Sequence, residues 1–122
     1  MILHNDAVDA ILTRRSIRSY QAKQISEDAL ETILTAGQYA PSGMNQQSAK
    51  AIVVQSKERM QQLVQLAKAA EQVDHNPFYD APTVILVFAD ATQLAPLEDG
   101  CNVLENMMLA AHAIGLGSCW IY

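Results

Sequence analysis

Residues 99–122 read DGCNVLENMMLAAHAIGLGSCWIY and contain the only long apolar run of the chain, Met107–Tyr122. That run is broken by His112 and is too short to cross about 30 Å of hydrocarbon, so we expect it to form part of a protein core. We expect a helix from about Asp99 to Ile114 and the start of a strand at Ser118–Tyr122. The helix is predicted because apolar side chains recur at the spacing of one helix face: Val103, Leu104, Met107, Met108, Ala111 and Ile114.

Three further helices are predicted upstream. Residues that favour helix N-termini precede each of them: Asn5 or Asp6, Ser26, and Ser56. Gly37 is expected to stop the second helix because glycine is common just past a helix end. The third helix would bury one apolar face, made of Met60, Leu63, Val64 and Ala67.

Two strands are expected, at Ala51–Val54 and at Thr83–Ala89. The second is a continuous apolar run, the pattern of a strand covered on both faces. Because helices outweigh strands and the strands lie too far apart for hairpins, the fold class is α+β, or α/β with a small central sheet. Neither a repeat nor a linker divides the chain, so residues 1–122 form one domain.

Composition excludes several classes of function. Eight Lys and Arg face 13 Asp and Glu, which gives a net charge of −5 and no field that attracts nucleic acid. The N-terminus lacks a secretory pattern, so no membrane partner is expected. Cys101 and Cys119 are expected to be free thiols, which indicates a cytoplasmic location. The histidines and cysteines are too scattered for a metal site or an activated nucleophile.

The basic residues are concentrated in one place: three of the eight lie in Arg14–Arg18, R-R-S-I-R. Guanidinium groups with a nearby hydroxyl and backbone N–H groups suit a phosphate dianion. The alternative is that Arg14 and Arg15 only complement the negative end of the first helix.

Two other segments offer polar backbone to a ligand. The loop Ala40–Ser48 is rich in amides that could face the edge of a planar heterocycle, although an ordinary surface loop has a similar composition. Residues Gly115–Trp120 are not a dinucleotide fingerprint, because they follow a helix and precede a strand. They are either a helix stop with a tight turn or a set of N–H groups facing a ligand.

The three segments R-R-S-I-R, A-P-S-G-M-N-Q-Q and D-x6-N-x2-L-A-A-x3-G-L-G-S-C-W-I resemble, in order and spacing, the FMN-dependent nitroreductase family over roughly residues 7–122. The resemblance implies a nitroreductase-like fold, a small sheet flanked by helices, and a homodimer with two FMN molecules at its interface. It implies an enzyme in which NADH or NADPH reduces the flavin at N5, and a small acceptor such as a nitroaromatic or quinone reoxidises it.

The resemblance also assigns cofactor-binding residues. The phosphate, ribityl and pyrimidine region would meet Arg14, Arg15 through its backbone, Ser16 and Arg18. The ring would be approached, from one subunit or its mate, by Pro41, Ser42, Gly43, Asn45 and Gln47. Trp120, Ile121 and Tyr122 would line the ring, with backbone N–H groups near the atoms that accept hydride. No catalytic side chain is expected, because hydride transfer to a flavin requires positioning and charge stabilisation more than an acid or base.

The chain departs from the family pattern in three respects. Ser48 and Ala49 stand where Pro and Trp are usual, and the loop 73–82 has no lysine. The family pattern also continues beyond Tyr122, so we interpret the domain as incomplete at its C-terminal end. The alternative function is a non-catalytic flavin- or nucleotide-binding remnant, or an interaction module.

Overall fold

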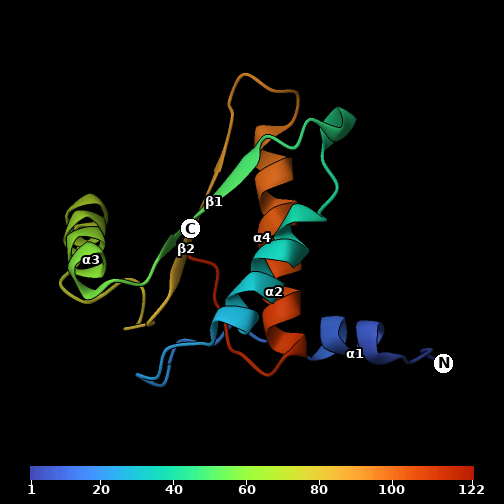
Figure 1. Cartoon of the computed structure of the whole chain (residues 1–122), viewed down its shortest axis with the longest axis horizontal. Helices are drawn as coiled ribbons and strands as arrows, with labels where there is room; N and C mark the ends of the chain where they lie inside the picture. The colour runs from blue at the N-terminus through green and yellow to red at the C-terminus, as the bar shows by residue number, and fades with distance from the viewer.

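The computed structural model describes all residues from Met1 to Tyr122 and has an α+β architecture (Figure 1). In chain order the elements are α1 (Asp6–Thr13), α2 (Glu27–Gln38), the 3-10 turn η1 (Gly43–Asn45), β1 (Ala49–Val54), α3 (Lys57–Glu71), β2 (Val84–Ala89) and α4 (Pro96–Ala113). The predicted fold class is confirmed. None of the helices has the length and apolarity needed to cross a bilayer.

The predicted helix starts are confirmed by side-chain caps. The side chains of Asn5, Ser26 and Ser56 each accept a hydrogen bond from the N–H three residues later, at 2.8, 3.2 and 3.2 Å. The last helix begins three residues earlier than expected, at Pro96. Proline is favoured at the first helical position, because its fixed φ suits the helix and the N–H it lacks would have no partner there.

The sheet consists of β1 and β2, which pair antiparallel from Ala49 opposite Ala89 to Val54 opposite Val84. One face packs on α4, through residues such as Val87. The expectation that the second strand is covered on both faces is wrong, because on the opposite face Phe88 is 56% exposed. The strand expected at Ser118–Tyr122 is also absent: only a single parallel bridge, between Ser16 and Ser118, forms there.

The core lies between α2 and α4, where Ile33 meets Met107 and Ala111. Gly37 does not stop α2 as predicted: it is buried inside the helix, which ends at Gln38. A Cβ at Gly37 would lie 2.8 Å from Met107 Cγ, so this glycine is required by close helix packing.

Outside this core the elements are loosely packed, and the chain exposes a large surface. Its accessible surface is 8707 Å², against about 6,500 Å² for a compact monomer of its mass. Helix α3 lies across the sheet from α2 and α4 (Figure 1). Exposed apolar side chains include Leu66 on α3 and Ile52 and Phe88 on the sheet. The chain therefore presents more apolar surface than a closed domain does.

Candidate functional site

Two of the segments singled out from the sequence lie side by side. After α1 ends, the segment Arg14–Arg18 runs alongside Gly117–Cys119, and Ile17 N–H donates to the carbonyl of Ser118 at 2.9 Å. A Cβ at Gly117 would lie 3.1 Å from the side chain of Ile17. The absence of a side chain at Gly117 therefore allows this close approach.

The arginines of this segment have different environments. Arg15 Nη1 donates to the carbonyls of Leu12 and Arg14, at 3.0 and 2.8 Å, so this side chain complements the end of α1. Arg14 is only 23% exposed, and its Nε lies 3.8 Å from Glu105 Oε1. Its Nη1 is buried and has no hydrogen-bond partner. Arg14 therefore retains a donor for an incoming acceptor.

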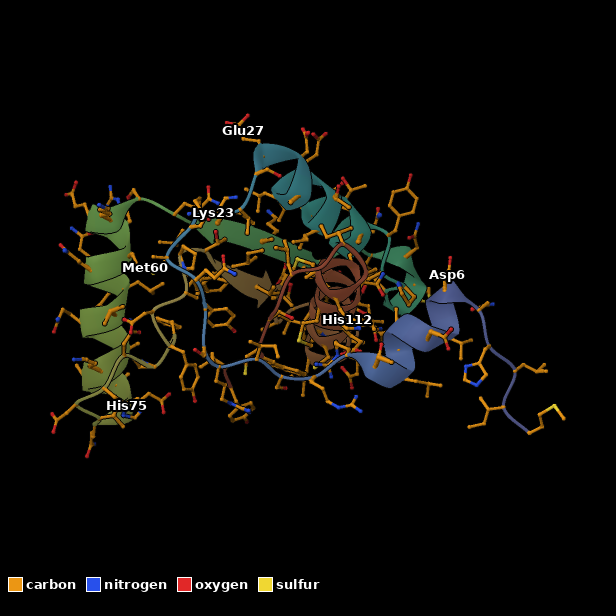
Figure 2. The ribbon with its side chains drawn as sticks, turned by 90° about the horizontal axis from the view of Figure 1, so that it is seen from below. Asp6, Lys23, Glu27, Met60, His75 and His112 are labelled. Carbon is orange, nitrogen blue, oxygen red and sulfur yellow. The ribbon has the colours of Figure 1, made fainter.

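A second contact fixes the end of α1 on α4. Thr13 Oγ1 lies 2.8 Å from His112 Nε2 and also donates to the carbonyl of Asp9, at 2.6 Å. Because the single hydroxyl proton is used for Asp9, His112 Nε2 must be the donor to Thr13. Figure 2 shows His112 on the side of α4 next to α1. The start of the arginine segment is thus held by α4.

A hollow of about 230 Å³ lies next to Arg18. One wall is the end of the chain, and the other comes from the segment after α3, where His75 lies (Figure 2). The lining residues are Arg18, Glu71, Val73, His75, Pro77, Tyr79, Cys119, Trp120, Ile121 and Tyr122. Those between Glu71 and Tyr79 were not predicted as site residues; the only feature of the loop 73–82 noted from the sequence is that it has no lysine. Both cysteines are free, as expected.

Tyr20, which is partly buried, supports the arginine segment through a hydrogen bond. Its hydroxyl donates to the carbonyl of Ile17. Burial raises the pKa of Tyr20 above its ordinary value, with a smaller contribution from Cys119 that Arg18 opposes. At neutral pH this tyrosine is therefore an uncharged donor that holds the segment in place.

The amide-rich loop lies elsewhere, near the start of α4 (Figure 1). Gly43 N–H donates to Asp99 Oδ1 at 2.8 Å, and Asn102 Nδ2 donates to the carbonyl of Pro41 at 3.3 Å. A second hollow of about 300 Å³ lies behind the loop. Its walls are Gly37, Gln38, Ala40, Pro41, Ser42, Gln47, Ala49, Asp99 and Val103.

The two regions do not meet within one chain. Their hollows share no residue. Asp99, which holds the loop, and His112, which holds α1, are separated by about 20 Å along α4, at 1.5 Å per residue. The structure therefore brings together the predicted residues of the arginine segment and of the chain end. The predicted loop residues form a separate group: Pro41, Ser42, Gly43, Asn45 and Gln47.

Comparison with known proteins places the chain in a family. The model described as "Nitroreductase family" matches residues 11–122. The chain belongs to the Nitroreductase family.

Relatives and solved structures agree with this assignment. A protein of Methanothermobacter thermautotrophicus is 33% identical over 119 residues, which cover 94% of this chain and 60% of that protein. The FMN reductase of Bacillus subtilis is 35% identical over 120 residues, 92% of this chain and 46% of the reductase. The chain thus spans between 46% and 60% of the length of these relatives.

Among solved structures, a Bacteroides fragilis nitroreductase with bound FMN superposes with a TM-score of 0.91 at 34% identity, covering 97% of this chain and 70% of that one. An FMN-dependent nitroreductase of Clostridium difficile superposes with a TM-score of 0.83 at 32% identity, covering 94% and 59%. The predicted nitroreductase-like fold is confirmed.

Proposed function

We propose that this chain is an FMN-dependent oxidoreductase that passes electrons from NADH or NADPH to a small acceptor such as a nitroaromatic or a quinone. The observation that carries the proposal is the junction of the arginine segment with Gly117–Cys119, beside a hollow that has Arg18 at its edge. Support also comes from the relatives, one of which is an FMN reductase, and from the solved structure that contains FMN.

The arginine segment fits the phosphate end of FMN. Arg14 Nη1 is buried without an acceptor, and a phosphate oxygen would supply one through a charge-assisted hydrogen bond. Ser16, two residues further along the same segment, is exposed. Arg15 would contribute backbone only, because its side chain is occupied at the end of α1.

The hollow fits the ring end of FMN. Trp120, Ile121 and Tyr122 supply flat or apolar walls, and Arg18 supplies positive charge at the edge. FMN, when bound, accepts a hydride from the nicotinamide and returns the electrons to the acceptor. The chain's own residues would orient the ring, exclude water from one face and stabilise negative charge with Arg18. No side chain is assigned as acid or base.

We further propose that a second copy of the chain completes each site. The loop residues Pro41, Ser42, Gly43, Asn45 and Gln47 would reach the ring from the partner copy. Two observations support this homodimer: the loop and the hollow lie apart in one chain, and the exposed surface is larger than a compact monomer requires. A cytoplasmic location stays a prediction.

The test is to titrate the purified chain with FMN, follow flavin fluorescence, and then measure NADH and NADPH oxidation with a quinone and with a nitroaromatic. Saturable binding, acceptor-dependent oxidation and a sedimentation mass of two chains are expected. Binding without oxidation would support the non-catalytic alternative. Absence of binding would contradict the cofactor assignment, and a monomer with full activity would contradict the shared site.

A further inference from the structure

Asp99 is the most deeply buried polar residue of the chain, at 2% exposure. Its Oδ1 accepts the Gly43 N–H at 2.8 Å, and its Oδ2 is buried with no partner. A buried carboxylate oxygen without a hydrogen bond lowers stability. The residue therefore calls for an explanation other than stability.

The loop held by Asp99 has an unfavourable backbone. Met44, Asn45 and Gln47 have positive φ angles of 54°, 54° and 51°. Asparagine tolerates this left-handed region, but methionine and glutamine rarely adopt it. Such a conformation persists only where surrounding contacts hold it in place.

Packing supplies only part of those contacts: Gly43 lies against Ala95 and Leu94, but a hollow of about 300 Å³ lies beside Pro41, Ser42 and Gln47. Hydrogen bonds must supply the rest. Two are backbone bonds within the turn, Asn45 N–H to Ser42 O and Gln46 N–H to Gly43 O, at 3.0 and 3.1 Å. Three use side chains at exposed positions: Gln47 N–H to Ser42 Oγ, Leu94 N–H to Gln46 Oε1, and Asn102 Nδ2 to Pro41 O, at 3.0, 2.9 and 3.3 Å. The bond from Gly43 to Asp99 is partly buried and has a carboxylate acceptor. Bonds of that kind are the stronger ones.

We propose that Asp99 is a positioning residue that holds the loop Ser42–Gln47 in the conformation that receives the flavin ring. The proposal rests on the proposed function, in which this loop contacts FMN. Asp99 touches no cofactor itself. It raises the fraction of chains whose loop is ready to bind, and the apparent affinity is proportional to that fraction.

The experiment compares Asp99→Ala and Asp99→Asn with the control Glu98→Ala, which removes an exposed carboxylate from the same first turn of α4. Hydrogen exchange at the Gly43 amide is measured in the flavin-free chain, and the FMN dissociation constant is measured separately. Asp99→Ala is expected to accelerate Gly43 exchange and weaken FMN binding, each by roughly tenfold or more. Asp99→Asn retains an oxygen acceptor and should recover most of both losses, and Glu98→Ala should match wild type.

A second variant covers the case in which Asp99→Ala does not fold. Gly43→Pro removes the donor and leaves the sequence of α4 unchanged, and residue 43 follows the extended Ser42, the conformation that a residue before proline prefers. Its Cβ would lie 3.2 Å from Ala95 Cβ, so the fold of this variant is first checked by circular dichroism. It should weaken FMN binding as Asp99→Ala does. The proposal would be overturned if the Gly43 amide of Asp99→Ala exchanged its hydrogen as slowly as in wild type. It would also be overturned if Asp99→Ala or Gly43→Pro bound FMN with an affinity within twofold of wild type. If wild type itself does not bind FMN, the proposed function fails, while the exchange measurement still shows whether Asp99 holds the loop.

Discussion

Replacing Arg14 with alanine is expected to weaken FMN binding by about 5- to 60-fold. The buried Nη1 of Arg14 lacks a partner, and one charge-assisted bond to a phosphate contributes about 1.5–3 kcal/mol. In the free chain Arg14 already shares its charge with Glu105 in a partly exposed ion pair, so about 0.5 kcal/mol is subtracted from that contribution. The net loss of about 1–2.5 kcal/mol corresponds to the stated range at 1.4 kcal/mol per tenfold.

The assay is a fluorescence titration of FMN with the Arg14→Ala variant. Arg59→Ala is the matched control, because Arg59 is exposed on α3 and its side chain donates only to Gln62, at 3.2 Å. Arg14→Lys keeps the charge but loses the planar fork, so its affinity should fall between wild type and Arg14→Ala. An Arg14→Ala affinity within twofold of the Arg59→Ala control would refute the phosphate assignment.

Three further predictions concern stability. Gly37→Ala should lower the melting midpoint, because overpacking against Met107 costs about 1–3 kcal/mol and exceeds the helix-propensity gain of about 1 kcal/mol. Gly100→Ala should instead raise the melting midpoint, because its new Cβ would lie 4.0 Å from its neighbours. Equal shifts of the midpoint in Gly37→Ala and Gly100→Ala would contradict the packing argument. Ser26→Ala should reduce the free energy of unfolding in urea by about 1 kcal/mol, through loss of the α2 cap, and no change would mean that the cap is not formed. Folding raises the pKa of Tyr20, so its contribution to the free energy of unfolding should be complete below pH about 10 and should be lost as the pH rises above that value. A Tyr20→Phe variant whose free energy of unfolding depends on pH in the same way would exclude this tyrosine as the cause.

The helices were predictable where their signals are local. Ser26 and Ser56 cap helices through hydrogen bonds to residues three positions away, so neighbouring sequence is sufficient to locate them. Gly37 was misread because its role depends on Met107, which is 70 residues further along the chain. The open face of β2 was misread for a similar reason: an apolar run does not specify what covers it.

The sequence was sufficient to predict which kinds of residue form the site, but not which segments come together in space. The pairing of Arg14–Arg18 with Ser118 is a contact across about 100 residues that no local pattern encodes. His75 and Tyr79 were missed, since the loop 73–82 was compared with the family pattern only for a lysine that it lacks. The buried carboxylate of Asp99 was also missed as a support for the loop, because its hydrogen bond to Gly43 joins residues 56 positions apart in the chain.

Helix α4 holds the two halves of the site at different points along its length. Asp99 and Asn102 bind the loop, whereas Glu105 and His112 contact the end of α1. At 3.6 residues per turn, a one-residue insertion between Asn102 and Glu105 would rotate everything downstream by about 100° and turn its anchors away from α1. We therefore expect homologous chains to vary freely in the length of their surface loops but to keep a constant number of residues in this part of the helix.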